Sequence, residues 1–309
     1  MAILRHVFLK ASRSAWLAER LGRRGFTRRA VRRFMPGERL EDALAAAAEL
    51  RAAGLSTVLT LLGENVTDTA EAERIQAHYH EALSGLAASN SGGHISVKLT
   101  HLGLDVDRRL AESSVHSLAE RAAELGSFLW IDMEGSEHTD VTLDIYRMVR
   151  SAQVGVGVCL QAYLHRTEGD LRSLLPLEPA IRLVKGAYQE PSNIAIRRKR
   201  EVDRNYVRLA ELLLEACREQ GIRPAFATHD GRMIHEIRRT AEGMGIRSDA
   251  FEFQMLYGIR REEQMRLAAE GFPMRVLISY GDGWFPWYMR RLAERPANVW
   301  FVVRSLVAR

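Results

Sequence analysis

The 309-residue sequence has only two cysteines, no long uncharged apolar run and no glycine-rich phosphate loop. Cys159 and Cys217 lie in apolar contexts without CxxC or Cys/His spacing, which predicts reduced core thiols rather than a disulfide or a metal site. Reduced thiols are typical of cytoplasmic proteins, so we expect a cytoplasmic location. The turn after the first apolar strand pattern reads LTLLGENVTD and lacks a G-x-G-x-x-G fingerprint, which argues against a doubly wound nucleotide-binding sheet.

The opening segment lacks the features of a secretory signal. Its apolar stretch is interrupted by Arg5 and His6, and no small-residue cleavage site follows. No later run approaches the ~18 uncharged apolar residues that a membrane-spanning helix needs. We therefore expect neither a signal peptide nor a membrane span.

Charge of one sign does not dominate, since 44 Lys and Arg residues stand against 39 Asp and Glu residues. The basic cluster RRGFTRRAVRR at residues 23–33 would suit phosphate contacts, but its aromatic residues form no stacking series. A solvated basic helix is the simpler interpretation, and we expect no nucleic-acid function. A weak attraction to anionic lipid surfaces or to an acidic partner stays open.

Eight short segments rich in β-branched and apolar residues recur along the chain, and each is separated from the next by enough residues for one helix. They begin near residues 56, 94, 128, 156, 181, 224, 251 and 275. The intervening stretches carry Ala, Leu, Glu and Arg at helical spacing, and several end in glycine, which favours helix termination. Eight strand-then-helix units whose strands look buried on both faces predict an α/β fold of the (β/α)8 barrel type.

The first 40 residues precede the first barrel unit and are predicted to form helices that cover the barrel or lie along its side. No linker rich in Gly, Ser or Pro separates them from the rest. We therefore expect a single domain overall, with an N-terminal helical segment at 1–40 and the barrel at 41–309. A final helix after the eighth strand is expected to cover the active site.

Polar side chains follow the predicted strands, at the end of a barrel where function gathers. Alone, each has an ordinary explanation, such as helix capping by Asp132 or Thr228, or packing by Tyr188. Together they indicate one polar site, because charged groups within strands are costly to bury without partners. The residues are Lys98, Asp132, Glu134, Gln161, Tyr163, Arg182, Lys185, Tyr188, Thr228, His229, Gln254 and Tyr280.

An arginine pair follows the last predicted strand, in the stretch WYMRRLAERPANVWF. Arg290 and Arg291 could simply be solvated, as most arginines on amphipathic helices are. They could also bind an anion, because a guanidinium matches a carboxylate or phosphate in geometry and charge. This stretch alone leaves both interpretations open.

The motifs IDMEG, LQAYLHRT, RLVKGAY, FATHD, FQMLYG and WYMRRLAERPANV, in this order and spacing, closely resemble the proline dehydrogenase family. The resemblance covers roughly Phe34 to the C-terminus and suits a monofunctional bacterial form. It implies a (β/α)8 barrel with noncovalently held FAD that oxidises L-proline to 1-pyrroline-5-carboxylate by hydride transfer to the flavin N5. It also implies a quinone acceptor, and the basic N-terminal helices would then assist peripheral docking at the inner face of a membrane.

The resemblance further implies roles for individual residues around the substrate. The pair Arg290 and Arg291 would bind the proline carboxylate, and Lys98 would approach the same group. Asp132 would be an acidic, catalytic residue of the pocket. The walls around the proline ring would be Tyr280, Tyr288 and Leu256.

For the cofactor, Arg182 matches the arginine near the flavin N5, where a cation favours electron density arriving on the ring. The other implied contacts to the isoalloxazine, ribityl and diphosphate groups are Met133, Gln161, Lys185, Gly186, Ala187, Tyr188, Thr228 and His229. One departure is Gln189, where many relatives carry tryptophan, and this bears on the adenine or ribityl environment.

Two hypotheses from other classes stay open on the residues alone. A Schiff-base aldolase on the same fold would use Lys98 or Lys185 as its nucleophile, because a lysine beside other cations is easier to deprotonate. A non-enzymatic binding module would hold DNA or lipid through the basic N-terminal helices.

Overall fold

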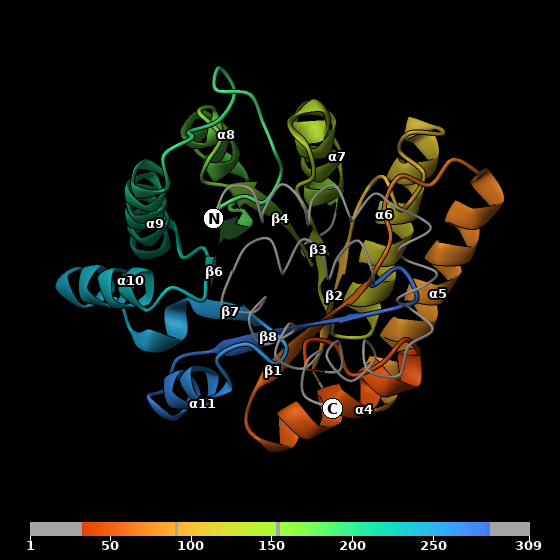
Figure 1. Ribbon diagram of the computed structural model, residues 1–309, viewed down its shortest axis with the longest axis horizontal. Coiled ribbons are helices and arrows are strands. Elements are labelled where there is room, and N and C mark those ends of the chain that lie inside the picture. Colours follow the sequence, from red (N-terminus) through yellow and green to blue (C-terminus); the bar gives the residue numbers. More distant parts are fainter. Residues whose placement is uncertain (1–32, 90–91, 153–154, 285–309) are drawn as a thin grey trace, which may run out of the picture.

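The computed structural model describes residues 33–89, 92–152 and 155–284, and these form a closed barrel of eight parallel strands in chain order. Figure 1 shows the strands at the centre and the helices arranged around them. The predicted (β/α)8 fold is confirmed. The strands are β1 (Ser56–Leu61), β2 (His94–Val97), β3 (Leu129–Ile131), β4 (Val156–Gln161), β5 (Ala180–Val184), β6 (Ala225–Ala227), β7 (Glu252–Leu256) and β8 (Met274–Tyr280).

The barrel closes where the first strand meets the last. β1 pairs with β8 in parallel over six residues, from Ser56 opposite Arg275 to Leu61 opposite Tyr280. The shortest strands, β3 and β6, have three residues each, but both pair with neighbours on either side. Because all the strands are parallel, their carboxyl ends lie at one end of the barrel.

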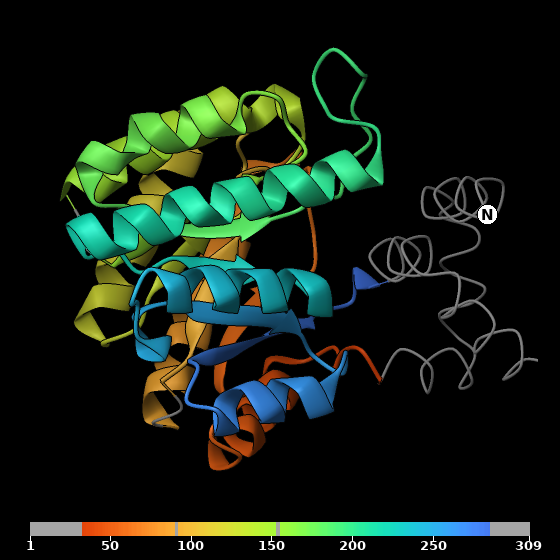
Figure 2. The same cartoon turned by 90° about the vertical axis from the view of Figure 1, so that its left-hand side faces the viewer.

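Helices connect successive strands and pack on the outside of the barrel, as Figures 1 and 2 show. Aspartates at 68, 107 and 230 accept a backbone hydrogen bond two residues on and so cap three of them. Gly221, with φ of 73°, ends the longest one in the left-handed conformation. The helices are α4 (Leu40–Ala52), α5 (Thr69–Ala88), α6 (Arg108–Glu124), α7 (Thr139–Ala152), α8 (Thr167–Leu174), α9 (Lys199–Gln220), α10 (Gly231–Gly243) and α11 (Arg261–Ala269).

Two separate apolar clusters show which side chains face into the barrel. The large cluster joins apolar residues of strands and helices, and it includes both cysteines, which are buried free thiols. A small cluster joins Val58, Trp130 and Ala225 from strands that are not neighbours, so these side chains meet across the barrel interior. Leu277 packs on this inner cluster. Since side chains alternate along a strand, the inner or outer direction of the other strand residues follows.

Several predictions concern residues outside the described part of the chain. Residues 1–32, which include most of the predicted N-terminal helices, and the predicted final helix after β8 both lie outside it. Residues 33–39 form turns and bends before α4 begins at Leu40. The division at residue 40 therefore stays a prediction. Among the described helices, none combines the length and the apolar character needed to cross a membrane.

Candidate active site

A cavity of about 480 Å³ opens at the carboxyl end of the barrel strands. It is lined by residues that follow or end seven of the eight strands, β2 to β8, so no single element builds it. Thirteen residues predicted from the sequence line it: Lys98, Asp132, Met133, Gln161, Arg182, Lys185, Gly186, Ala187, Tyr188, Thr228, His229, Gln254 and Leu256.

The floor of the cavity carries a buried ion pair. Arg182 of β5 donates from Nη1 to Asp132 Oδ1 at 2.7 Å, and Asp132 follows directly after β3. Ser96 of β2 joins both, since its Oγ donates to Asp132 Oδ1 and accepts from Arg182 Nη1, each at 2.8 Å. The Arg182 side chain is 3% exposed and that of Asp132 is 21% exposed. The Arg182 guanidinium is therefore shielded from solvent, whereas the Asp132 carboxylate reaches the cavity.

The Arg182 guanidinium packs on an aromatic ring and keeps two N–H donors without a hydrogen-bond partner among the described residues. Its Cζ lies 4.6 Å from the ring centre of Trp130, which packs in the barrel interior beneath it. Its Nε and Nη2 are buried and have no hydrogen-bond partner within the described residues. Gln254 Oε1, on β7, is buried and unpartnered in the same sense. Unsatisfied buried polar atoms are costly, so these groups in the cavity lining indicate a ligand that would satisfy them.

Two further charged residues, one directly after β2 and one after β3, have different surroundings. Lys98 is partly exposed, lines the cavity and lies 3.4 Å from the carbonyl oxygen of Gly63 through its Nζ. Glu134 is 3% exposed and accepts from the Thr100 amide at 3.0 Å and from Thr100 Oγ1 at 2.5 Å. Burial raises the pKa of Glu134 above its ordinary value, although these hydrogen bonds act in the other direction. Glu134 therefore fixes the loop after β2 rather than lining the cavity.

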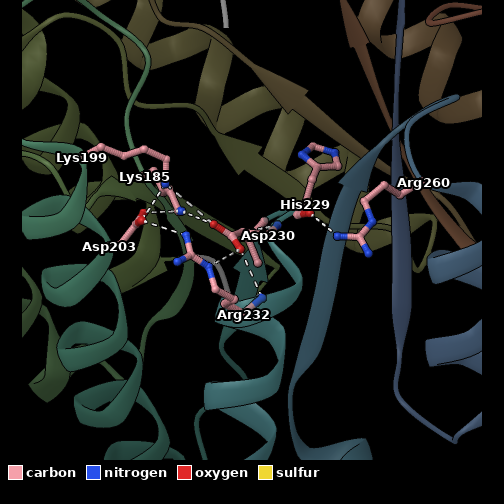
Figure 3. Close-up of polar contacts among 8 residues, drawn as sticks. Lys185, Lys199, Asp203, His229, Asp230, Arg232 and Arg260 are labelled. Carbon is pink, nitrogen blue, oxygen red and sulfur yellow. Dashed lines mark hydrogen bonds and ion pairs between the residues drawn. The ribbon is translucent and has the colours of Figure 1, made fainter. Parts of the chain in front are cut away.

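The opposite wall carries Lys185, Thr228 and His229. Lys185, directly after β5, contacts the carboxylates of Asp203 and Asp230, as Figure 3 shows. Thr228 Oγ1 accepts from the Asp230 amide at 3.1 Å. His229 Nε2 accepts from the Leu256 amide at 2.9 Å, which places the ring proton of neutral His229 on Nδ1. This wall presents donors suited to an anionic or polar ligand.

Gly186 has a backbone conformation, and a distance to Tyr163, that a residue with a side chain would not fit. Its φ is +110°, and a Cβ at this position would lie 2.1 Å from Cδ1 of Tyr163. Ala187 and Tyr188 follow it along the cavity edge. Gln189, the departure noted above, is exposed and does not line the cavity.

Other predicted site residues lie elsewhere. Tyr280 is fully buried, and its hydroxyl lies 3.0 Å from His78 Nε2 of α5. Because Leu277 faces the barrel interior, Tyr280, three residues further along β8, faces the helices instead. Tyr280 does not line the cavity of the described chain, whereas Leu277 does. Tyr288, Arg290 and Arg291 lie outside the described residues.

Sequence reasoning missed several residues that complete the site. Ser96 and Trp130 support Arg182, Cys159 and Leu277 line the cavity, and Asp203 contacts Lys185. Alternation along the strands carried a signal for Ser96 and Trp130, because they share the inward face with Asp132. Asp203 gave no such signal, since an aspartate in the first turns of a helix is ordinary. Within the described ranges, no group of three or more His, Cys, Asp or Glu is arranged to hold a metal ion.

His101, in the loop after Lys98, links the site to the acid stability of the fold. It is 6% exposed, and burial, with Lys98 and His78 nearby, lowers its pKa to about 4 against the opposing effect of Glu64. The unfolded chain therefore takes up a proton below about pH 6.5 that the folded protein excludes until about pH 4. Stability should fall as the pH drops through this window, by up to about 3 kcal/mol from this residue.

Urea unfolding of the wild type and of His101→Gln at pH 7 and pH 4.5 tests this expectation. The variant should lose less stability between the two pH values, because glutamine takes up no proton. His235→Gln, an exposed histidine on α10, is the matched control and should behave like the wild type. An equal loss in wild type and His101→Gln would assign the acid sensitivity to other groups.

Comparison with known proteins gives a consistent result. A family model described as proline dehydrogenase matches residues 43–304. Proline dehydrogenase 1 of Bacillus subtilis (strain 168) is 37% identical over 305 residues, which are 99% of this chain and 99% of the relative. Proline dehydrogenase of Deinococcus radiodurans is 39% identical over 280 residues, which are 89% of each chain.

Solved structures agree with the fold. Proline utilization A (PutA) from Bdellovibrio bacteriovorus, inactivated by N-propargylglycine, superposes with a TM-score of 0.80 at 25% identity. The match covers 87% of this chain and 33% of that protein, so this chain spans about a third of its length. PutA from Bradyrhizobium japonicum (mutant D778Y) gives a TM-score of 0.76 at 25% identity over 90% of this chain and 32% of that one.

Proposed function

The chain belongs to the proline dehydrogenase family and is an oxidoreductase, and from this premise we propose that it oxidises L-proline to 1-pyrroline-5-carboxylate with FAD as the electron acceptor. This reaction is the first step of proline degradation. Two electrons and one hydrogen leave C5 as hydride, one proton leaves the amine, and a C=N bond forms. Bound FAD would supply the acceptor for the hydride.

One observation carries the proposal: a single cavity gathers the Asp132 and Arg182 pair, Lys98 and the polar wall at Lys185. The donor set suits a flavin. The unpartnered Nε and Nη2 of Arg182 offer two buried donors to the ring edge, and Gln254 Oε1 offers an acceptor. Gly186 lacks the Cβ that would overlap the Tyr163 ring, so the segment that follows β5 can take the path that carries Lys185, Ala187 and Tyr188 to the cavity.

The residues proposed to hold FAD fall into two groups. Arg182 would hold the flavin ring by its buried guanidinium, with Met133 and Gln161 beside it. Lys185, Thr228 and His229 would hold the ribityl and diphosphate groups, because they supply a cation and polar side chains at the cavity edge. Gly186, Ala187 and Tyr188 would form the adjoining wall.

The proposed substrate residues act by binding and orientation. Lys98, with Arg290 and Arg291, would hold the carboxylate, and Leu256 would contact the ring. Among the described residues, both hydrogen bonds that the Asp132 side chain accepts fall on Oδ1, so Oδ2 would be available to accept from the substrate amine. Asp132 would thereby hold the amine proton near a fixed carboxylate. Tyr288 remains a proposed ring contact, whereas the Tyr280 side chain faces α5 and its hydroxyl contacts His78.

The decisive experiment is an absorption spectrum of the purified protein before and after anaerobic addition of L-proline. Flavin bands that bleach with L-proline but not with D-proline would support cofactor, substrate and hydride transfer together. A colourless protein that takes up no FAD would contradict the proposal. Borohydride trapping with a carbonyl substrate would then test the lysine-dependent aldolase alternative.

Replacing both Arg290 and Arg291 with methionine should raise the KM for L-proline about 100-fold or more, because two charge-assisted contacts to the carboxylate are lost. The flavin spectrum should not change, since these residues are assigned to the substrate. Steady-state kinetics over a wide proline range measure the effect. Arg247→Met, which removes an exposed arginine paired with Asp249, is the control, and an unchanged KM in the double variant would remove the clamp from the mechanism.

We further propose a quinone as the final electron acceptor and a cytoplasmic location with peripheral contact at the inner face of the membrane. The chemistry of a two-electron acceptor suits reduced flavin, and the basic residues at 23–33 suit anionic lipid. Nearly all of those residues lie outside the described part of the chain. Reoxidation of the proline-reduced protein by a water-soluble quinone, followed by stopped-flow absorbance, tests the acceptor, and failure to reoxidise would contradict it.

A further inference from the structure

Asp203, in the first turns of α9, contacts cations from three parts of the chain. Its carboxylate contacts Lys185 Nζ at 2.5 Å, Lys199 Nζ at 2.6 Å and Arg232 Nη2 at 3.7 Å. The side chain is only 12% exposed. Burial would raise its pKa, but the hydrogen bonds from Lys185 and Lys199 outweigh burial and the pKa lies below its ordinary value. Asp203 is therefore a buried carboxylate that stays charged.

Asp230 provides the second carboxylate of this charge network, which consists of Lys185, Lys199, Asp203, Asp230 and Arg232. It lies 3.1 Å from Lys185 Nζ and 3.9 Å from Lys199 Nζ. Its other oxygen caps α10 by accepting from the Arg232 amide at 3.1 Å. Asp230 thus has a structural task of its own, whereas every side-chain contact of Asp203 given above is to a cation.

Figure 3 shows how the charge network is arranged, with the Lys185 ammonium between the carboxylates of Asp203 and Asp230. Lys185, Lys199 and Asp230 line the cavity, but Asp203 and Arg232 do not. Lys185 thus belongs to the cavity lining, and it contacts Asp203, which does not line the cavity. Three cations and two carboxylates leave an excess of one positive charge at this edge.

The network has an evident physical cost. A carboxylate near an anion-binding site repels the anion. Removing the carboxylate would therefore strengthen anion binding if the electrostatic potential alone set the affinity. A lysine on a four-carbon stem, however, loses rotamer freedom whenever it is fixed by a ligand. A carboxylate that fixes the ammonium beforehand reduces that loss, at the cost of some attraction.

We propose that Asp203 is a positioning residue that holds the Lys185 ammonium in place for the diphosphate of a dinucleotide cofactor. This inference rests on the proposed FAD dependence and deepens it. Asp203 acts through Lys185 and touches neither cofactor nor substrate. The part of the cofactor that it would serve is the diphosphate rather than the flavin ring.

Equilibrium titration of the cofactor-stripped protein with FAD and with riboflavin, which lacks the diphosphate, tests the proposal. Asp203→Asn should raise the Kd for FAD about tenfold, the size expected from releasing one long side chain. Its Kd for riboflavin should change by less than about twofold, because riboflavin lacks the diphosphate that the Lys185 ammonium would bind. In a Lys185→Met background, Asp203→Asn should have no further effect on the FAD Kd.

The controls separate positioning from general damage. Asp249→Asn removes a carboxylate paired with an exposed arginine far along the chain, and it should leave both Kd values unchanged. If Asp203→Asn does not fold, Asp203→Ser removes the same charge and carries the same test. Tighter or unchanged FAD binding, or an equal weakening for riboflavin, would overturn the positioning role. A wild-type protein that binds no FAD would instead refute the proposed function on which this inference rests.

Discussion

Replacing Arg182 with methionine should lower kcat for proline oxidation by about 10²- to 10³-fold, the loss typical of removing one fixed group that stabilises developing charge. The guanidinium is 3% exposed, contacts Asp132 at 2.7 Å and keeps two buried donors unpartnered within the described residues. Methionine fills a similar volume but leaves Asp132 with Ser96 as its remaining partner. Single-turnover reduction of the flavin by L-proline measures the effect directly.

A second arginine in the barrel interior supplies the matched control. Arg275 pairs with Glu252 at 3.1 Å and donates to the Thr57 carbonyl oxygen at 3.0 Å, but it does not line the cavity. Arg182→Met and Arg275→Met should both lose stability, because each leaves a partly buried carboxylate without its arginine partner. Of these two variants, only Arg182→Met should lower kcat. Arg182→Lys should retain part of the activity, because lysine keeps the positive charge but lacks the planar guanidinium with its paired donors. Equal kcat losses at both positions would deny Arg182 a chemical role.

Changing Gly186 to alanine should abolish FAD binding in the purified protein, with a Kd raised by more than about 100-fold. The residue has φ of +110°, a conformation that alanine adopts only with strain. The new Cβ would also lie 2.1 Å from the Tyr163 ring, so the segment that follows β5 must move. That segment carries Lys185, Ala187 and Tyr188 into the cavity, and their displacement should remove the proposed diphosphate contacts.

The absorbance ratio at flavin and protein wavelengths measures bound FAD in this variant. Gly169→Ala is the control, because Gly169 lies in α8 and a Cβ added there would have no atom within 4 Å beyond its own helix backbone and chain neighbours. Alanine there should be neutral or stabilise the helix by up to about 1 kcal/mol. The double variant Gly186→Ala with Tyr163→Ala should recover only part of the affinity, since the strained φ remains. A Gly186→Ala protein that retains bound flavin would contradict this prediction, because the segment after β5 would then accommodate the new Cβ without losing the cofactor.

The fold was predictable because its signals are local and repeated. Eight apolar strand patterns, separated by helical ones that end in residues such as Gly221 and Gly271, recur along the chain. Parallel strands buried on both faces need helices outside them, so the pattern permits few architectures. The cavity residues were also largely predictable, since Asp132, Arg182 and Lys185 are charges in otherwise apolar strand segments.

Tyr280 shows where this reasoning reached its limit. A polar residue at a strand end suggested a cavity wall, but alternation with Leu277 turns its side chain toward α5 and His78. Which residues of β8 face the barrel interior is known only from the structure, in which Leu277 packs against residues of strands across the barrel. The sequence of one strand does not state which of its two faces is the inner one.

Local sequence patterns were sufficient to predict the order of strands and helices, the barrel class and the family, because these depend on short segments and on motifs in register. Which charges meet depends instead on the folded barrel. Ser96, Asp132 and Arg182 come from three different strands or their ends, and Lys185, Asp203 and Asp230 come from three connected but separate elements. Their contacts arise because barrel closure brings all the strand ends to one rim, a geometry that no local segment contains.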